Sequence, residues 1–216
     1  MKYKKQVDES HYEFNRYVDE QRWHSYYYQI RMVSDVARKL GKKKITILEI
    51  GIGNGIITAI LKHLGHKVIT MDIDRKLRPD IVKVLPNVPK GRTYDCVVCC
   101  EVLEHIKYKD SAISLKRLSI IAKFVVLSIP QKGIHFSYAI KASLLPQLRG
   151  IISLPFYHLP HAFDGQHYWE LGTSGISERK FRDLLLHSRF NVLFDMRLQA
   201  NPYHHFYLLQ SKRYGK

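Results

Sequence analysis

Acidic residues and glycines mark the ends of the apolar segments in this sequence. Glu49 lies in the run ITILEI, and three glycines, Gly51, Gly53 and Gly55, follow before an apolar helical pattern resumes. A glycine-rich turn of this kind lets the backbone approach a ligand at a helix N-terminus, where N–H groups are unpaired. A dinucleotide turn has the form G-x-G-x-x-G, whereas the third glycine here comes one residue early. Because Glu49 would repel a pyrophosphate and attract an ammonium group, we predict a ligand that carries a cation.

Two further acidic positions end apolar segments downstream. Asp72 closes KVITMD, where a carboxylate can accept both hydroxyls of a ribose, as it does in dinucleotide folds as well. The segment YDCVVCCEVLEHI, residues 94–106, reads as a buried strand that ends in a turn with Glu101, Glu104 and His105. These positions predict a nucleoside-binding edge without distinguishing the nucleoside.

Strand and helix patterns alternate along the chain, and this alternation must position those residues. A mainly parallel sheet with helices on both faces is expected from it. The predicted strands are 45–50, 67–72, 95–100 and 124–129, with helices at 56–64 and 109–122. Towards the end we predict a helix over 177–188, capped by Ser177, and then the strands FNVLFDMRL and HHFYLLQSK.

The chain reads as one domain, 1–216, because 216 residues with 45% hydrophobic content can bury a single core. Residues 1–40 are expected to form an N-terminal helical cap, whose aromatic side chains either close over the ligand or pack between helices. Residues 131–173 are too long for a simple connection and are expected to form a cap over the substrate.

The segments EIGIGNG, VITMDID and YDCVVCCEVLEHI together resemble the class I S-adenosylmethionine-dependent methyltransferases, in particular the bacterial methyltransferase type 11-like family. The resemblance covers 45–106 and extends more loosely through RYVDEQRW, FDGQHYWELG and NPYHHFYLL. It implies a Rossmann-like α/β fold with a seven-stranded sheet in the order 3-2-1-4-5-7-6 and strand 7 antiparallel. Where the family often has an acidic or polar contact to the adenine edge, residues 81–94 contain no acid, so recognition of adenine N6 is either absent or left to backbone.

The resemblance also implies a cofactor, S-adenosyl-L-methionine, and roles for matching positions. Glu49 and the turn Gly51 to Gly55 would hold its methionine moiety, and Asp72 its ribose hydroxyls. Ile73 would contact the adenine face, and the backbone around Glu101 would bind the amino group.

A methyl acceptor that carries a proton needs a general base. The candidates for this base lie at the carboxyl edge of the predicted strands and in the predicted cap: His105, His135, Asp164, His167 and Glu170, with the three histidines preferred. The run FDGQHYWE concentrates acids, a histidine and aromatic residues, which suits a polar substrate. The alternative is a loop whose histidine and tryptophan pin it to the core.

The absence of two known motifs narrows the possible classes of methyl acceptor. Adenine-N6 methyltransferases often carry D/N/S-P-P-Y/F/W after strand 4, where this chain has CCEVLE, and Cys100 lacks the Pro-Cys context of cytosine-C5 enzymes. We therefore favour methyl transfer to an O or N nucleophile of a small molecule, lipid or glycan. A nucleic-acid substrate stays possible because the formal net charge is +16. A non-catalytic protein that binds S-adenosylmethionine is the third interpretation, and the oligomeric state is left open.

No metal site is predicted from the spacing of potential ligands. Cys96 and Cys99, three apart on a strand, point to opposite faces. Two histidine pairs lack a Cys or acidic partner at ligand spacing: His158 with His161, and His204 with His205. Because the N-terminus lacks an apolar signal region and no run reaches the length of a membrane span, we expect a cytoplasmic protein.

Overall fold

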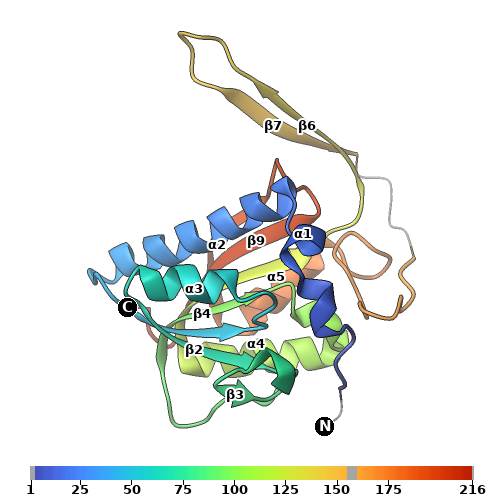
Figure 1. The fold of residues 1–216 in the computed structure, drawn as a ribbon. Coiled ribbons are helices and arrows are strands. Elements are labelled where there is room, and N and C mark those ends of the chain that lie inside the picture. Colours follow the sequence, from blue (N-terminus) through green and yellow to red (C-terminus); the bar gives the residue numbers. More distant parts are fainter. Residues whose placement is uncertain (1–2, 155–159, 216) are drawn as a thin grey trace.

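Seven strands form the central sheet of the computed structural model, which describes residues 3–154 and 160–215 (Figure 1). Their order is β3-β2-β1-β4-β5-β9-β8, and β9 runs antiparallel to both of its neighbours. Because β6 (Ile134–Ile140) and β7 (Leu148–Leu154) form a separate two-stranded sheet, β8 and β9 are the sixth and seventh strands of the central sheet. The predicted order 3-2-1-4-5-7-6 with strand 7 antiparallel is therefore confirmed. The strands are β1 Thr46–Ile50, β2 Lys67–Asp72, β3 Ile81–Val82, β4 Tyr94–Cys100, β5 Ala122–Pro130, β8 Phe190–Arg197 and β9 His204–Ser211.

Helices cover both faces of this sheet (Figure 1). Side chains cap the N-termini of two of the longer helices: Asp19 accepts the N–H of Arg22, and Ser177, as predicted, accepts the N–H of Lys180. The longer helices are α2 Glu20–Lys39, α3 Ile56–His63, α4 Tyr108–Ile121 and α5 Glu178–His187. The short ones are η1 Glu9–Tyr12, α1 Phe14–Tyr17, η2 Arg75–Leu77 and η3 Leu103–His105.

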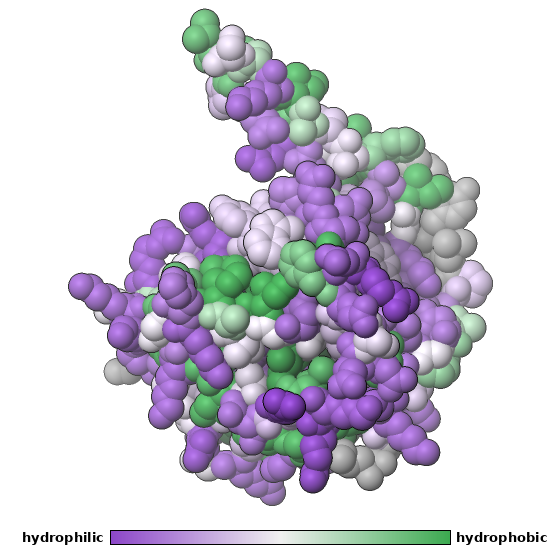
Figure 2. All heavy atoms as spheres, in the orientation of Figure 1, coloured by the Kyte–Doolittle hydropathy of each residue, from purple (hydrophilic) through white to green (hydrophobic). Residues whose placement is uncertain are grey.

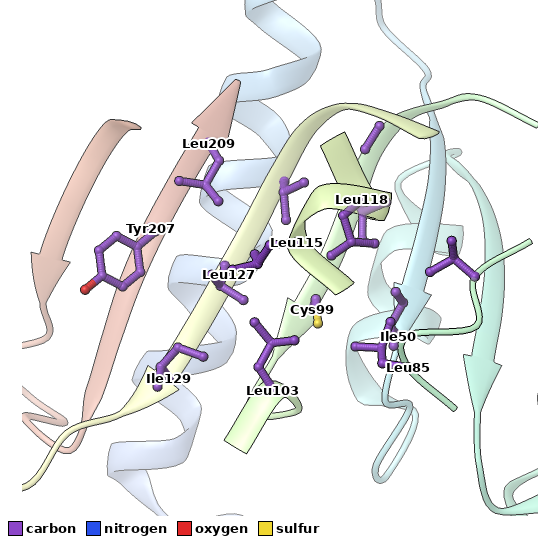
Figure 3. Packing of buried hydrophobic residues seen from close by; sticks show 14 of the residues in the cluster. Ile50, Leu85, Cys99, Leu103, Leu115, Leu118, Leu127, Ile129, Tyr207 and Leu209 are labelled. Atoms are coloured by element: carbon purple, nitrogen blue, oxygen red, sulfur yellow. The ribbon is translucent and has the colours of Figure 1, made fainter. Parts of the chain in front are cut away.

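Neighbouring residues of each buried strand join different core layers. One layer combines apolar residues of α2 and α3 with one face of the sheet, and the other combines α4 and α5 with the opposite face. Figure 3 shows the second layer, where Leu115 and Leu118 of α4 belong to the same cluster as Leu127 of β5. Cys96 lies in the first layer and Cys99 in the second. This confirms the prediction that the two side chains point to opposite faces of the sheet, where they cannot pair with each other.

A β-hairpin projects from the body between β5 and α5 (Figure 1). Its strands, β6 Ile134–Ile140 and β7 Leu148–Leu154, pair only with each other among the described residues. Figure 2 shows hydrophobic and hydrophilic residues mixed along it. At its tip Leu144 is 95% exposed and Leu145 69% exposed. This hairpin, which the sequence did not predict, occupies the first half of the expected cap and extends away from the sheet.

The two ends of the 131–173 segment are clamped to each other at the edge of the body. The N–H of Lys132 donates to Leu171 O (2.9 Å), and the N–H of Leu171 donates to Pro130 O (3.0 Å). The returning part then packs on the core: Trp169, 2% exposed, donates its Nε1–H to Ile106 O at 3.0 Å. Within residues 3–154 and 160–215, no helix is both long and apolar enough to cross a membrane.

Candidate functional site

The glycine turn after β1 adopts a backbone that only glycine accommodates easily. Gly51 has φ +80°, and a Cβ there would lie 2.5 Å from Cγ2 of Val102. Gly55, with φ +76°, is the N-cap of α3. The turn therefore brings backbone N–H groups to the carboxyl edge of the sheet, as the sequence predicted.

Glu49 lies below this turn and is only 3% exposed. Its Oε2 accepts a hydrogen bond from Thr58 Oγ1 on α3. Burial raises the pKa of Glu49 to about 7, although the Thr58 hydroxyl and the Lys62 charge favour ionisation. A bound cation would therefore find a carboxyl group that it can still ionise.

Asp72, at the tip of β2, anchors the glycine turn. Its Oδ2 accepts the N–H of Ile52 (2.9 Å), and its Oδ1 accepts the N–H of Asp74 (2.8 Å). Burial raises its pKa, partly offset by these backbone donors. Since each carboxylate oxygen has a second lone pair, Asp72 can hold the turn and a ribose together.

Two pockets meet at this edge. They share Tyr12, Ile50, Gly51 and Glu101. The first is mainly apolar with charged residues of both signs, and its lining includes Asp72, Ile73, Leu77, Leu85, Val102 and His105. The second is more polar and includes Arg22, Tyr26, Glu49, Gly53 and Asn54. Asp72 and Ile73, predicted to contact the adenosine, thus line the first pocket, and Glu49 and Gly53, predicted to hold the methionine moiety, line the second, while Gly55 lines neither.

The N-terminal segment crosses the first pocket, which the sequence analysis missed. Tyr3 accepts the N–H of Lys107 (3.1 Å) and contacts Asp110 through its hydroxyl, and Lys5 Nζ lies 3.3 Å from Asp74. These contacts join residues far apart in the sequence, so no local pattern could predict them. Residues of the predicted helical cap thus line the pocket partly as irregular chain.

Only some of the early aromatic residues line a pocket. Tyr17 and Tyr26 line the second pocket, and the Tyr26 hydroxyl accepts a hydrogen bond from Asn54 Nδ2 at 2.8 Å. Trp23 and Tyr27 are exposed. Tyr28 packs against the core beside Phe206, so these aromatic residues divide among the pocket, the core and the surface.

Glu101 follows β4 at the junction of the pockets with φ +53°. Its N–H donates to Ser128 O (3.1 Å), and its Oε1 accepts from Ser128 Oγ (2.7 Å). Its Oε2 lies 3.4 Å from Nε2 of His204, whose pKa is lowered by burial. The strand end is therefore fixed to β5 and β9.

His105 and His167 come together beside the first pocket, with ring centroids 5.0 Å apart. His167 Nδ1 donates to Oε1 of Glu170 (2.6 Å), which also accepts from the Tyr203 hydroxyl (2.7 Å). Burial would raise the pKa of Glu170, but hydrogen bonds from His167, Tyr203 and Lys132 outweigh it and lower the pKa. His167 is thus oriented by an ionised carboxylate.

Amide oxygens hold the His105 ring. Its Nδ1 donates to Gln6 Oε1 and lies 3.1 Å from Gln166 O. Burial, helped by His167, lowers the pKa of His105 to about 4, so the ring is neutral at pH 7. Two of the three predicted histidines therefore form one cluster.

The remaining predicted residues lie elsewhere or serve the local backbone. His135 lies on β6, where its Nδ1 is 3.1 Å from Gly133 O, and the structure does not bring it to the other two histidines. Asp164 is exposed, and its Oδ1 accepts the N–H groups of Gln166 (2.9 Å) and His167 (2.7 Å). His161 Nε2 lies 2.9 Å from His167 O, while His158 lies outside the described residues.

A sequence model of the family described as "Methyltransferase domain" matches residues 22–170. The match spans both pockets' strand ends and the His105–His167 cluster. A sequence search against curated proteins finds no match.

Solved structures share the fold at low sequence identity. A 1,6-didemethyltoxoflavin-N1-methyltransferase from Burkholderia thailandensis, bound to 1,6-didemethyltoxoflavin and S-adenosylhomocysteine, has a TM-score of 0.60 at 14% identity, covering 94% of this chain and 84% of that one. The N-methyltransferase NodS from Bradyrhizobium japonicum, bound to S-adenosylhomocysteine, has a TM-score of 0.60 at 9% identity, covering 92% of this chain and 91% of that one. An S-adenosylmethionine-dependent methyltransferase from Clostridium acetobutylicum has a TM-score of 0.59 at 12% identity, covering 93% of this chain and 95% of that one. At these identities the likeness establishes the fold.

Proposed function

This chain belongs to the methyltransferase domain family, and from that premise we propose that it transfers a methyl group from S-adenosyl-L-methionine to an oxygen or nitrogen nucleophile. The observation that carries the proposal is the pair of pockets that meet at Gly51 and Glu101. One contains Asp72 and the other Glu49. An adenosine and an amino acid joined in one molecule fit this division.

The residues present suit that cofactor. Asp72 keeps lone pairs for ribose hydroxyls, and Ile73 with Leu85 offers apolar contact to an adenine. Glu49 is buried next to glycine N–H groups, so an amino-acid group meets both an acid and backbone donors. The structural neighbours from Burkholderia and Bradyrhizobium were crystallised with S-adenosylhomocysteine, which supports the same assignment.

When bound, S-adenosylmethionine supplies an electrophilic methyl group, which passes to the acceptor as the carbon–sulfur bond breaks and sulfur keeps the bonding pair. The protein must align the acceptor, exclude water and receive the acceptor's proton. We assign the last task to the cluster of His105 and His167, since it borders the pocket and His105 is neutral at pH 7. Glu170 orients the His167 ring.

We propose a small molecule, lipid or glycan as the acceptor. Glu101 lines both pockets at the end of β4, and its carboxyl group opposes a phosphate backbone there despite the overall charge of +16. Incubation with methyl-labelled S-adenosylmethionine and fractionated cell extract tests this. Label in RNase-sensitive material would contradict the preference, and cofactor binding without turnover in every fraction would identify a non-catalytic binder.

The affinity for S-adenosylhomocysteine is expected to fall as the pH drops below about 7. Glu49 has a pKa of about 7 in the free protein, raised by burial, and a ligand ammonium prefers the ionised form. Binding at lower pH must therefore release a proton, and affinity falls by up to about tenfold per pH unit, while above pH 8 it is flat. Calorimetry between pH 5.5 and 8.5 measures this. Glu49→Gln should bind weakly with no such slope; an unchanged slope would assign the titration to another group.

Asp72→Ala is expected to weaken cofactor binding without unfolding the protein. It removes the acceptor of the ribose hydroxyls and of the Ile52 N–H, and each hydrogen bond to a charged group is worth about 1.5–3 kcal/mol. A loss of at least tenfold in affinity should appear in calorimetry. Asp95→Ala is the matched control, since Asp95 also accepts a backbone N–H, from Thr46 at 3.1 Å, at the start of β4. Equal affinities of wild type and Asp72→Ala would show that another residue holds the ribose.

A further inference from the structure

Glu104 is a buried acid for which the protein supplies no partner. It lies in η3 directly after β4 and is 0% exposed, and neither of its carboxylate oxygens has a hydrogen-bond partner among the described residues. The closest basic group is Nε2 of His105, 3.9 Å from Oε1 and beyond hydrogen-bond distance. Leaving a buried polar group unpaired costs about 1–3 kcal/mol, and more when it is charged. Protonation does not remove the need, because the carboxyl proton would itself need an acceptor.

The two neighbouring imidazoles each keep a ring nitrogen available. His105 uses its Nδ1–H toward Gln6 and Gln166, and His167 uses its Nδ1–H toward Glu170. In the neutral form of an imidazole whose Nδ1 carries the proton, Nε2 has the lone pair. A histidine whose second nitrogen donates to a carboxylate or carbonyl is the arrangement that orients metal-bound imidazoles.

One ligand atom from each of these three residues lies within 4.8 Å of the other two. Ligands about 2.1 Å from a common ion are at most about 4.2 Å apart, so side-chain shifts of under about an ångström would complete the coordination. We propose that Glu104, His105 and His167 bind a divalent transition-metal ion.

A second set of potential ligands shares His167 but has its atoms engaged. Asp164 is exposed and accepts two backbone N–H groups. Glu170 accepts from His167 and Tyr203 through Oε1, and its Oε2 lies 3.1 Å from Lys132 Nζ. Asp164 shapes the turn and Glu170 orients a ligand, so the ion lies on the Glu104 side.

Two imidazoles and one carboxylate, without a thiolate, suit ions such as Zn²⁺, Fe²⁺ or Co²⁺ better than Mg²⁺ or Ca²⁺. Three protein ligands leave coordination positions open. The role of the ion rests on the proposed function. In this arrangement the Nε2 atoms of His105 and His167 would hold the ion in place of accepting the acceptor's proton. The ion would lower the pKa of an acceptor hydroxyl, whose proton would pass to water, and the oxygen would bond to the methyl carbon as the carbon–sulfur bond breaks with its electron pair on sulfur. The acceptor class is therefore one with a hydroxyl group.

The test is a titration of metal-free, tag-free protein with Co²⁺ and Zn²⁺. Calorimetry should give a tight site for one ion per chain, and Co²⁺ should develop visible d–d absorption. Glu104→Gln, which keeps the side-chain shape, and His105→Gln should each lower the affinity by about a hundredfold or more. His63→Ala removes an exposed histidine of α3 and should leave the site unchanged, which controls for surface binding.

Thermal melts monitored by circular dichroism identify any variant that fails to fold, and the other variant then decides the result. The proposal is overturned if the wild type binds no stoichiometric ion, or if the folded variants bind it as the wild type does. Binding of S-adenosylhomocysteine is measured in parallel. If it persists without metal binding, only the metal site fails; if metal binds and S-adenosylhomocysteine does not, only the proposed function fails.

Discussion

His167→Ala is expected to lower methyl transfer by about a hundredfold or more while leaving cofactor affinity nearly unchanged. His167 lines neither of the two cofactor pockets, yet it packs against His105 and is oriented by Glu170. Alanine removes the ring nitrogen that would either accept the acceptor's proton or bind the proposed metal ion, so both roles predict a lower rate. Single-turnover rates at matched cofactor occupancy measure the loss.

Two comparisons sharpen this expectation. Glu170→Gln should reduce the rate less than His167→Ala, because an amide oxygen can still accept the Nδ1–H of His167. His187→Ala, an exposed histidine at the end of α5, should match the wild type. Equal turnover by wild type and His167→Ala would remove His167 from the chemistry and leave His105 as the histidine to test.

Gly51→Ala is expected to cost both folding stability and cofactor affinity. A non-glycine residue at φ +80° costs about 1–2 kcal/mol, and relieving the 2.5 Å contact with Val102 Cγ2 adds about 1–3 kcal/mol of overpacking. Urea denaturation should show a total loss of about 2–5 kcal/mol. Because the turn must move to relieve the clash, S-adenosylhomocysteine binding should weaken at least tenfold.

Gly41→Ala separates the two causes. Gly41 has φ +63° at the end of α2, and a Cβ there would meet nothing within 4 Å, so only the backbone cost of about 1–2 kcal/mol applies. Adding Val102→Ala to Gly51→Ala should restore part of the stability, since it removes Cγ2. If Gly51→Ala and Gly41→Ala lose the same stability, the contact with Val102 carries no energy.

The buried strands of the sheet could be predicted from the sequence because each one has a recognisable local pattern. β1, β2, β4 and β5 are apolar runs bounded by polar or glycine residues, and all were expected within two residues of their observed ends. β3 was not predicted, since Ile81–Val82 is too short to show a period. β6 and the first part of β7, residues 148–152, are largely exposed, so the burial that produces a strand pattern is missing and the sequence did not predict either strand.

The candidate site was predictable only where it follows the strand ends. Glu49, the glycines and Asp72 each end a strand or begin a helix, so their common edge follows from the topology. The position of the cluster Glu104, His105 and His167 does not follow from the topology, because His167 comes from a segment much later in the chain and no sequence spacing relates it to the other two. For the same reason the histidines gave no metal prediction from sequence.

The clamp at the base of the 131–173 segment has an evolutionary consequence. Lys132 and Leu171 are hydrogen-bonded across it, so the chain leaves and re-enters the body at adjacent points. Everything between those points closes a loop whose entropy changes only slowly with length, by about 0.6 kcal/mol per doubling. Descendants of this sequence can therefore lengthen, shorten or exchange the hairpin without disturbing the sheet. Selection for contacts made by the hairpin can therefore act independently of selection for folding of the sheet.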